Sequence, residues 1–323
     1  MFPCHGREGG HIIKRLFFVI LLLFIISIPS YAEKYDITVG TSLAFITRAD
    51  NLWGNGHKTI TSIYAKPKAT TIFLPVPFFN VKVTPGRDSP GKGTLDFYID
   101  TPLEPGSLSI GLKNRFQKSF VDVYGFYSFI AKNWQNPYAL YRRSTRTEFY
   151  GGKITYWNIL DTNIALSYRI AFTNVNKDVI GNLNSDLRQD GITHAGTISY
   201  SHMLTNTLGL VPEFFYEKGD FDGKSNGYDS YGGSLGLDYR RTTFILNTRV
   251  YGRAAKFDKV HPLYFKTRDE NTYGATAIAT FLNPFGLKKY LLSLGVNGNK
   301  TNSNITFFDK YGIVYFAIVG YKF

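Results

Sequence analysis

The sequence has 323 residues, of which 44% are apolar and 19% charged, with 27 phenylalanines, 23 tyrosines and a formal net charge of +13. So many aromatic residues exclude a disordered chain, because they can bury more apolar surface than ordering the chain costs. The single cysteine excludes a disulfide scaffold. The longest apolar run, residues 16–28, is shorter than the roughly 20 residues that a membrane-spanning helix needs, so a helical membrane bundle is not expected.

The first segment has the features of a secretory signal peptide. Basic residues precede the apolar run and small residues follow it: Arg7, Lys14, Arg15, Ser30 and Ala32. We predict that residues 1–32 are removed by cleavage between Ala32 and Glu33, which leaves residues 33–323 as a single domain. A retained anchor helix is the alternative, but the run is short and ends in a cleavage-like motif. The only cysteine, Cys4, lies in the segment that would be removed.

Beyond this leader, apolar residues alternate with polar or small ones along most of the chain. From residue 35 to 45 the odd positions are apolar apart from Thr41, and the even positions are polar or small. A period of two is typical of a β-strand with two different faces. Pro75 and Pro77 interrupt the second such segment, since proline cannot donate to the ladder. In total the pattern predicts fourteen strands, over residues 35–46, 70–83, 94–100, 107–116, 120–130, 147–159, 163–174, 194–203, 208–218, 230–241, 243–254, 272–282, 290–299 and 312–323.

Short turns and longer polar loops alternate between these segments, as in an up-and-down meander. The first loop, residues 47–69, is the longest and is a candidate for folding into the lumen, although it would also serve as an ordinary surface loop. The polar face of the strands consists mostly of Gly, Ser, Thr, Ala and Asn, and the other face of Leu, Ile, Val, Phe and Tyr. Lipid outside and water inside explain both faces. The sequence therefore predicts an all-β, antiparallel transmembrane β-barrel of about 14 strands, with 12 or 16 as alternatives, rather than a soluble all-β protein.

The last strand ends on an aromatic residue, with apolar residues at every second position before it. This pattern, which ends in Tyr321 and Phe323, resembles the last-strand signal of bacterial outer-membrane barrels. It implies recognition by the barrel-assembly machinery and a location in the outer membrane of a Gram-negative bacterium. Outer-membrane lipid and lipopolysaccharide would then be the surroundings of the barrel. No sequence feature indicates an oligomeric state.

Carrying the alternation through each strand assigns a set of ionisable side chains to the inner, water-lined face. The basic members are Lys113, Arg115, Lys153, Arg169, Arg240, Arg249 and Arg253, and the acidic members are Asp36, Asp122, Glu213, Glu217 and Asp238. The small excess of basic groups predicts a mildly cationic interior that favours anions. Pairing of these charges across a closed lumen is an equally good interpretation.

Basic residues also gather in two of the long loops. We expect them to contact the phosphate groups of lipopolysaccharide, to which arginine binds through two parallel hydrogen bonds, although plain solubility charge is the alternative. Nucleic acid is not an expected partner of an exported barrel. The candidate contact residues are Arg142, Arg143, Arg146, Lys266 and Arg268.

Catalytic and metal-binding motifs are not evident. The histidines that follow the leader, His57, His194, His202 and His261, have no spacing typical of a zinc site. The acidic segment 220–229 is rich in oxygen ligands, but Lys224 occupies a ligand position of an EF-hand loop, which favours a polar turn. We therefore expect no catalytic residue, no metal, no cofactor and no enzymatic activity.

Several short motifs resemble those of one bacterial family. They are Phe73-Leu74-Pro75-Val76-Pro77-Phe78-Phe79, Thr101-Pro102-Leu103-Glu104, Trp134-Gln135-Asn136-Pro137-Tyr138, Gly219-Asp220-Phe221-Asp222-Gly223, and His261-Pro262-Leu263-Tyr264-Phe265-Lys266-Thr267-Arg268 followed by Tyr273-Gly274. The chain resembles the proteobacterial family known as domain of unknown function 2860 over essentially all of its mature length. The resemblance implies an outer-membrane barrel and supplies no activity, substrate or site residue.

Three functions fit these observations. The first is a passive or weakly selective porin-like channel for small solutes with a slight anion bias. The second is a non-conducting structural or interaction barrel that binds lipopolysaccharide or a partner through its basic loops. The third, a transporter of hydrophobic solutes, would need a lateral opening, which the Pro75 and Pro77 interruption would mark. We favour the first function.

Overall fold

Fourteen long strands form one closed antiparallel barrel in the computed structural model, which describes residues 32–85, 94–101, 107–128 and 130–323. The predicted leader lies outside the described residues, apart from Ala32. The barrel strands are β1 (Ala32–Ala49), β2 (Ala69–Pro85), β3 (Thr94–Asp100), β4 (Ser107–Phe116), β5 (Ser119–Ser128), β7 (Ser144–Trp157), β8 (Ile164–Val175), β9 (Gly191–Tyr200), β11 (Leu208–Phe221), β12 (Tyr228–Arg240), β13 (Phe244–His261), β14 (Lys266–Leu282), β15 (Tyr290–Ser303) and β16 (Lys310–Lys322).

Every strand of the barrel pairs with its neighbours in chain order, and β1 pairs with β16 to close the ring. The predicted fold class and strand number are therefore confirmed. Two short strands, β6 (Lys132–Trp134) and β10 (His202–Met203), add to the edges of β7 and β11. Short helical segments lie in the connections: α2 (Val179–Leu183), η2 (Ile159–Asp161), η3 (Ser185–Leu187), η4 (Pro284–Gly286) and η5 (Thr306–Phe308).

The largest difference from the predicted boundaries concerns β13 and β14. Residues 255–271 were expected to form a loop, but both strands continue to a turn at 262–265, with a register shift between Lys256 and Val260. The outward residues Lys256 and Asp258 are charged, so the apolar alternation ends while the backbone ladder continues. Such outward charges are tolerated because this hairpin extends beyond the apolar part of the wall.

Large apolar side chains point outward around the barrel. The outward face includes Leu43, Phe45, Phe73, Leu166, Phe214, Tyr231, Leu235, Val250, Tyr273, Leu294, Tyr315 and Val319, all exposed. We call this surface the apolar belt. An exposed apolar surface of this extent suits lipid rather than water. Within the described ranges, no helix has the length and apolarity to cross a membrane.

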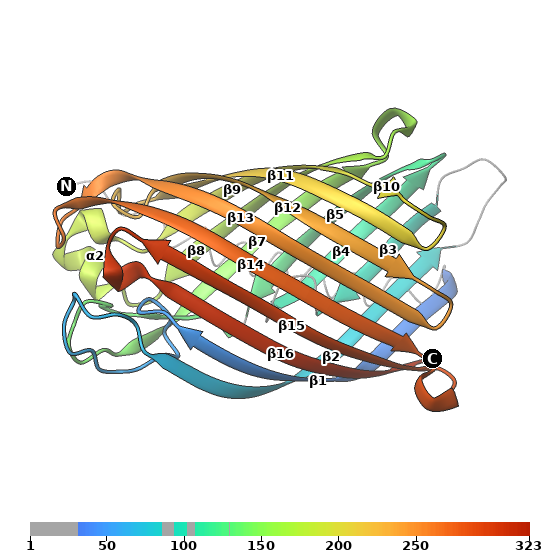
Figure 1. Ribbon diagram of the computed structural model, residues 1–323, viewed down its shortest axis with the longest axis horizontal. Coiled ribbons are helices and arrows are strands. Elements are labelled where there is room, and N and C mark those ends of the chain that lie inside the picture. Colours follow the sequence, from blue (N-terminus) through green and yellow to red (C-terminus); the bar gives the residue numbers. More distant parts are fainter. Residues whose placement is uncertain (1–31, 86–93, 102–106, 129) are drawn as a thin grey trace.

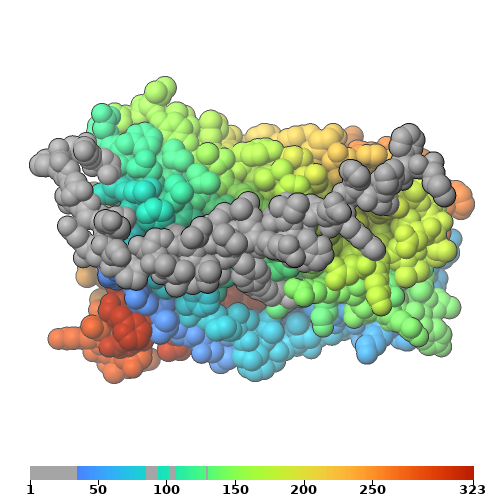
Figure 2. Space-filling model, turned by 180° about the vertical axis from the view of Figure 1, so that it is seen from behind, coloured from blue at the N-terminus to red at the C-terminus, as the bar shows by residue number. Residues whose placement is uncertain are grey.

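The two ends of the barrel differ. The long connections and α2 gather at one end, and the short turns lie at the other end together with the C-terminus (Figure 1). We call these the long-loop end and the short-turn end. The turn that contains η4 projects from the short-turn end (Figure 2), and the Phe285 side chain at its tip is 92% exposed. Aromatic rings also meet at this end, where Tyr321 packs against Tyr290 and Phe323.

Candidate functional site

Five connections meet at the long-loop end and form a hydrophobic core of their own. They join β1 to β2, β6 to β7, β8 to β9, β13 to β14 and β15 to β16. These connections leave the wall on different sides of the barrel and pack together at its mouth. We call this structure the loop cap. Its core consists of Tyr138, Ile180, Leu187, Tyr264, Ile305, Phe307 and Phe308, with Leu52, Ile60, Ile63 and Leu263 packed against it.

The first loop, residues 47–69, was a candidate for folding into the lumen. It contributes instead to the loop cap and is attached there by β-bridges from Trp53 to Asn133 and from Thr59 to Tyr141. Arg142 fixes it further, since its guanidinium donates hydrogen bonds to the carbonyl oxygens of Asn51, at 2.6 Å, and His57.

His261 lies at the centre of the loop cap and is fully buried. Its Nδ1 accepts a hydrogen bond from the Leu263 N–H at 3.2 Å, so Nε2 carries the proton and donates to Tyr138 Oη, 2.9 Å away. A protonated His261 would direct its Nδ1–H at the Leu263 N–H. Burial, with a smaller contribution from Arg268, lowers the pKa of His261 to about 3. The neutral imidazole is therefore part of the folded cap.

Arg142 and Arg268 were expected to contact lipopolysaccharide, and for both residues this expectation is wrong. Each is only 5% exposed. Arg142 lies over the Trp134 ring at 4.5 Å, and burial lowers its pKa to about 10. Arg268 lies between the rings of Phe257, at 3.4 Å, and Phe308, at 4.1 Å. Both guanidinium groups pack against aromatic rings inside the cap, whereas Arg143, Arg146 and Lys266 are exposed.

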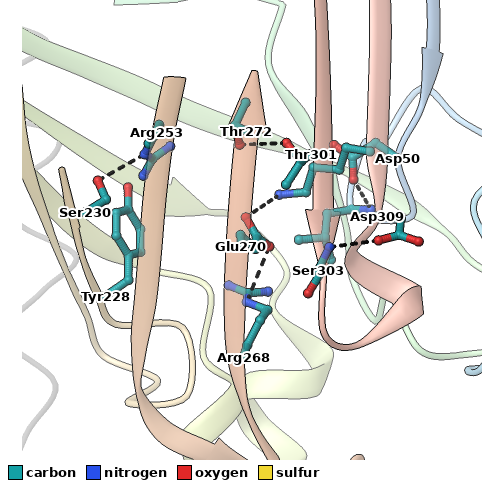
Figure 3. A network of polar contacts seen from close by, with 12 residues as sticks. Asp50, Tyr228, Ser230, Arg253, Arg268, Glu270, Thr272, Thr301, Ser303 and Asp309 are labelled. Atoms are coloured by element: carbon teal, nitrogen blue, oxygen red, sulfur yellow. Dashed lines mark hydrogen bonds and ion pairs between the residues drawn. The ribbon is translucent and has the colours of Figure 1, made fainter. Parts of the chain in front are cut away.

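An ion-pair network joins the loop cap to the wall (Figure 3). Glu270 on β14 lies 3.6 Å from Arg268 Nε and 3.6 Å from Lys310 Nζ on β16. Asp309 accepts a hydrogen bond from the Ser303 N–H at 2.8 Å, which fixes the short connection between β15 and β16. Because these groups are mostly buried, removing one member would leave its partner uncompensated.

Below the cap, all five predicted inward acids have partners on the inner wall. Glu213 accepts from Arg249 at 2.6 Å, and Glu217 accepts from Arg253 at 2.9 Å. The other acidic members of the predicted set have partners as well: Asp36 with Lys322 at 2.9 Å, Asp122 with Tyr98 at 2.5 Å, and Asp238 with Asn247 at 2.7 Å. The ion pairs of Glu213, Glu217 and Asp36 neutralise charge locally along the wall, whereas Asp122 and Asp238 accept hydrogen bonds from neutral groups.

The basic members are arranged less uniformly. Lys113 lies over the Phe120 ring at 3.8 Å, and Arg169 lies over Phe126 at 5.0 Å. Within the described ranges, Lys153 and Arg240 form no side-chain ion pair. The inner wall therefore carries basic groups outside its ion pairs, as well as carboxylates such as Asp238 whose hydrogen-bond partner is neutral.

A polar niche lies on the inner face of β2 to β5, with a cavity of about 220 Å³. It brings three predicted residues, Lys113, Arg115 and Asp122, together with residues that the sequence interpretation missed. Asp96 lies 3.0 Å from Lys82 and 3.6 Å from Arg115. Asp96, Tyr98 and Asp100 alternate with Leu95, Phe97 and Ile99, so the period-two signal was present in this short strand. The full lining is Asn80, Lys82, Asp96, Tyr98, Asp100, Lys113, Arg115 and Asp122.

The histidines and the acidic segment that the sequence drew attention to lie apart from the polar niche. No group of His, Cys, Asp and Glu there has the arrangement of a metal site. His194 lies on the outer face, where its Nδ1 is 2.6 Å from Tyr168 Oη. In the acidic segment 220–229, Lys224 pairs with Asp220 at 3.1 Å.

Comparison with known proteins gives a family and a set of structural likenesses. Among curated proteins, none matches the sequence significantly. The fold is similar to that of a loop L8 deletion mutant of OmpT, an outer membrane protein of Vibrio cholerae (7% identity, TM-score 0.44, covering 90% of this chain and 98% of that one). It is also similar to the outer membrane channel DcaP of Acinetobacter baumannii (8%, 0.41, 90% and 97%) and to an anion-selective porin from Comamonas acidovorans (8%, 0.38, 90% and 99%). Residues 35–322 match the family described as "Protein of unknown function (DUF2860)", and the chain belongs to that family.

Proposed function

We propose that this protein is an outer-membrane barrel channel for small solutes, whose external mouth is closed at rest by the loop cap. The observation that carries this proposal is the polar niche, a cavity lined by charged and hydrogen-bonding groups inside a closed barrel. A barrel of about fourteen strands lies between the filled eight-stranded and the open sixteen-stranded types. The apolar belt supports a location in lipid.

The two ends support one orientation. Outer-membrane barrels have short periplasmic turns and longer extracellular loops. The loop cap would then face the exterior, and the short-turn end would open to the periplasm. In this orientation, solutes pass only when the cap loosens.

The anion bias in this proposal is slight. Among the residues that the structure describes, Lys153 and Arg240 provide positive charge outside any ion pair, while the pairs Arg249–Glu213 and Arg253–Glu217 are internally neutral. Selectivity then depends on a few groups rather than on a continuous basic stripe.

A second candidate is a non-conducting barrel that binds lipopolysaccharide or a partner. The closed loop cap favours it, because a permanently covered mouth passes nothing. Its binding groups would be the exposed Arg143, Arg146 and Lys266.

Single-channel recording in planar bilayers separates the two candidates. The Phe307→Ala variant removes a fully buried ring from the cap core, and Tyr315→Ala is the matched control because this ring lies on the lipid-facing side. We expect brief, infrequent openings of the unaltered protein, frequent openings with Phe307→Ala, and no change with Tyr315→Ala. If the barrels insert and none of the three proteins conducts, the channel proposal fails and the second candidate remains.

A further inference from the structure

Two turns at the short-turn end of the barrel share one backbone conformation. The first contains η2 and joins β7 to β8, and the second contains η4 and joins β14 to β15. Each begins with an asparagine in the left-handed region, Asn158 and Asn283, both with φ of 54° and ψ of 51°. The carbonyl oxygen of each asparagine accepts a hydrogen bond at 3.2 Å from the N–H three residues later. We call these segments, residues 158–162 and 283–287, the paired turns.

The tip of each paired turn is an apolar residue in a backbone conformation that seldom suits one. Leu160 has a φ of 50° and Phe285 a φ of 56°. Glycine adopts this region freely and asparagine tolerates it, whereas a bulky residue there is an outlier. Leu160 is 86% exposed and Phe285 is 92% exposed, so packing against the rest of the chain does not explain these side chains. An unfavourable conformation that presents an apolar group outward indicates a function for that group.

The bases of the paired turns are fixed by hydrogen bonds. Asn158 donates from Nδ2 to the Lys118 carbonyl oxygen at 2.8 Å, and its own carbonyl oxygen accepts from Ser119 Oγ at 2.7 Å. In the second turn, Asn283 Oδ1 accepts from the Lys289 N–H at 3.0 Å. Both tips are therefore held out from the wall by an ordered turn.

The paired turns lie on opposite sides of the barrel. Going round the ring in one direction, the six strands β8, β9, β11, β12, β13 and β14 separate them, and in the other direction eight strands do. Figure 1 shows them at opposite edges of the short-turn end. A single partner protein would have to reach across this whole end to contact both tips. A lipid leaflet surrounds the barrel and contacts both at once.

The outer wall beside each paired turn carries a pair of aromatic rings. The centres of the Phe116 and Tyr156 rings are 6.1 Å apart near the first turn, and those of Tyr290 and Tyr321 are 5.0 Å apart near the second. Lys289 Nζ lies 6.0 Å from the centre of the Tyr321 ring. Tyrosine rings and lysine amines are typical of the boundary between hydrocarbon and water. The paired turns therefore begin where the apolar belt ends.

Other connections at this end show that apolar tips are not needed to join two strands. Residues 117–118, between β4 and β5, and residues 241–243, between β12 and β13, are polar and exposed. The connection between β9 and β11 exposes Met203 and Leu204. Because β9 is the neighbour of β8, these two side chains extend the apolar surface of the first paired turn.

We propose that the paired turns anchor the barrel in the lipid leaflet at its short-turn end, with Leu160 and Phe285 inserted among the phospholipids. Two anchors on opposite sides hold the depth of the barrel and resist its tilting. This inference rests on the membrane location of the proposed channel and is independent of whether the lumen conducts.

Spin labelling of single cysteines tests the anchors. The only cysteine of the sequence lies in the predicted leader, so an introduced cysteine carries the label alone. Leu160→Cys and Phe285→Cys place the label at the two tips. Thr242→Cys is the matched control on a polar turn of the same end, and Phe214→Cys is the lipid reference on the apolar belt. Collision of the label with oxygen, which concentrates in lipid, is compared with collision with a water-soluble nickel chelate.

The labelled proteins are measured in vesicles of phosphatidylethanolamine and phosphatidylglycerol, with the chelate on both sides. We expect the ratio of oxygen to nickel collisions at 160 and 285 to approach that at 214 and to exceed that at 242 several-fold. A ratio at the tips equal to that at 242 overturns the proposal, whether both values are low or the label alone draws both sites into lipid. Poor access of both reagents to the tips also overturns it, since it indicates a protein partner or a second copy.

Two further measurements keep the result decisive. If Phe285→Cys does not fold, Leu287→Cys reports from the same turn, where this residue is 53% exposed. A low ratio at 214 as well as at the tips would contradict the membrane location itself, whereas a low ratio at the tips alone contradicts only the anchors. Neither outcome depends on conductance, so the channel proposal is tested separately.

Discussion

Acidification should loosen the loop cap through His261. The pKa of this imidazole is lowered by burial from 6.5 to about 3, so between these values the unfolded cap binds a proton that the folded cap does not. The contribution of the neutral His261 imidazole to the stability of the folded cap is therefore fully present above pH 6.5 and is lost as the pH falls toward 3. At pH 5 the loss is about 2 kcal/mol, a value that changes little for any folded pKa below 4.5. The equilibrium constant for opening of the cap then increases about 30-fold.

Hydrogen exchange of the cap peptides measures this change, after correction for the intrinsic pH dependence of exchange. Amides of residues 176–190 and 304–309 should lose about 30-fold protection between pH 7.5 and pH 5, while the barrel strands keep theirs. His261→Asn is the control, because its side-chain oxygen can accept the Leu263 N–H without titrating. Unchanged protection of the unaltered protein at pH 5, or the same loss in His261→Asn, would refute the reasoning.

Three further predictions concern the cap, the lumen and assembly. Arg142→Gln should leave buried carbonyl groups unpaired, lower cap stability by about 1–3 kcal/mol and speed tryptic cleavage of the first long connection, whereas the exposed Arg143→Gln should not. Glu213→Gln should free the charge of Arg249 and move the reversal potential of an open channel toward anions; an unchanged potential would contradict this. Deleting Phe323 should lower the yield of assembled barrel in the outer membrane, measured by heat-modifiable gel mobility, and an unaltered yield would argue against an assembly signal.

The strands could be predicted from the sequence because alternation is a local property. A residue that faces lipid and a neighbour that faces water differ in polarity wherever the wall crosses the belt. The bounds expected for β3 and β4 agree with the structure. The upper parts of β13 and β14 were missed because alternation of apolar residues ends at the belt while hydrogen bonding continues beyond it.

The loop cap could not be predicted in the same way, because its contacts join distant parts of the chain. Tyr138 and His261 are 123 residues apart and share a hydrogen bond. The adjacent Phe307 and Phe308 in an otherwise polar connection were a signal of burial that went unused. Basic loop residues usually face water, so the sequence does not predict that Arg142 is buried. Its burial depends on carbonyl groups of another connection, which are distant in the sequence.

The register of β2 with β3 is an intermediate case. The interruption by Pro75 and Pro77 was visible in the sequence, whereas the register that pairs Asn80 with Asp100 and Val83 with Phe97 was not. Strand lengths alone do not give such a register.

If the loop cap closes the lumen toward the exterior and the short-turn end opens to the periplasm, a cysteine in place of Thr276, an inward residue of β14, is reached from the periplasm alone. Treatment of intact and permeabilised cells with a membrane-impermeant thiol reagent measures this directly. We expect slow labelling in intact cells, fast labelling after permeabilisation, and fast labelling in intact cells once Phe307→Ala loosens the cap. Fast labelling of intact cells with an unaltered cap would contradict closure by the cap.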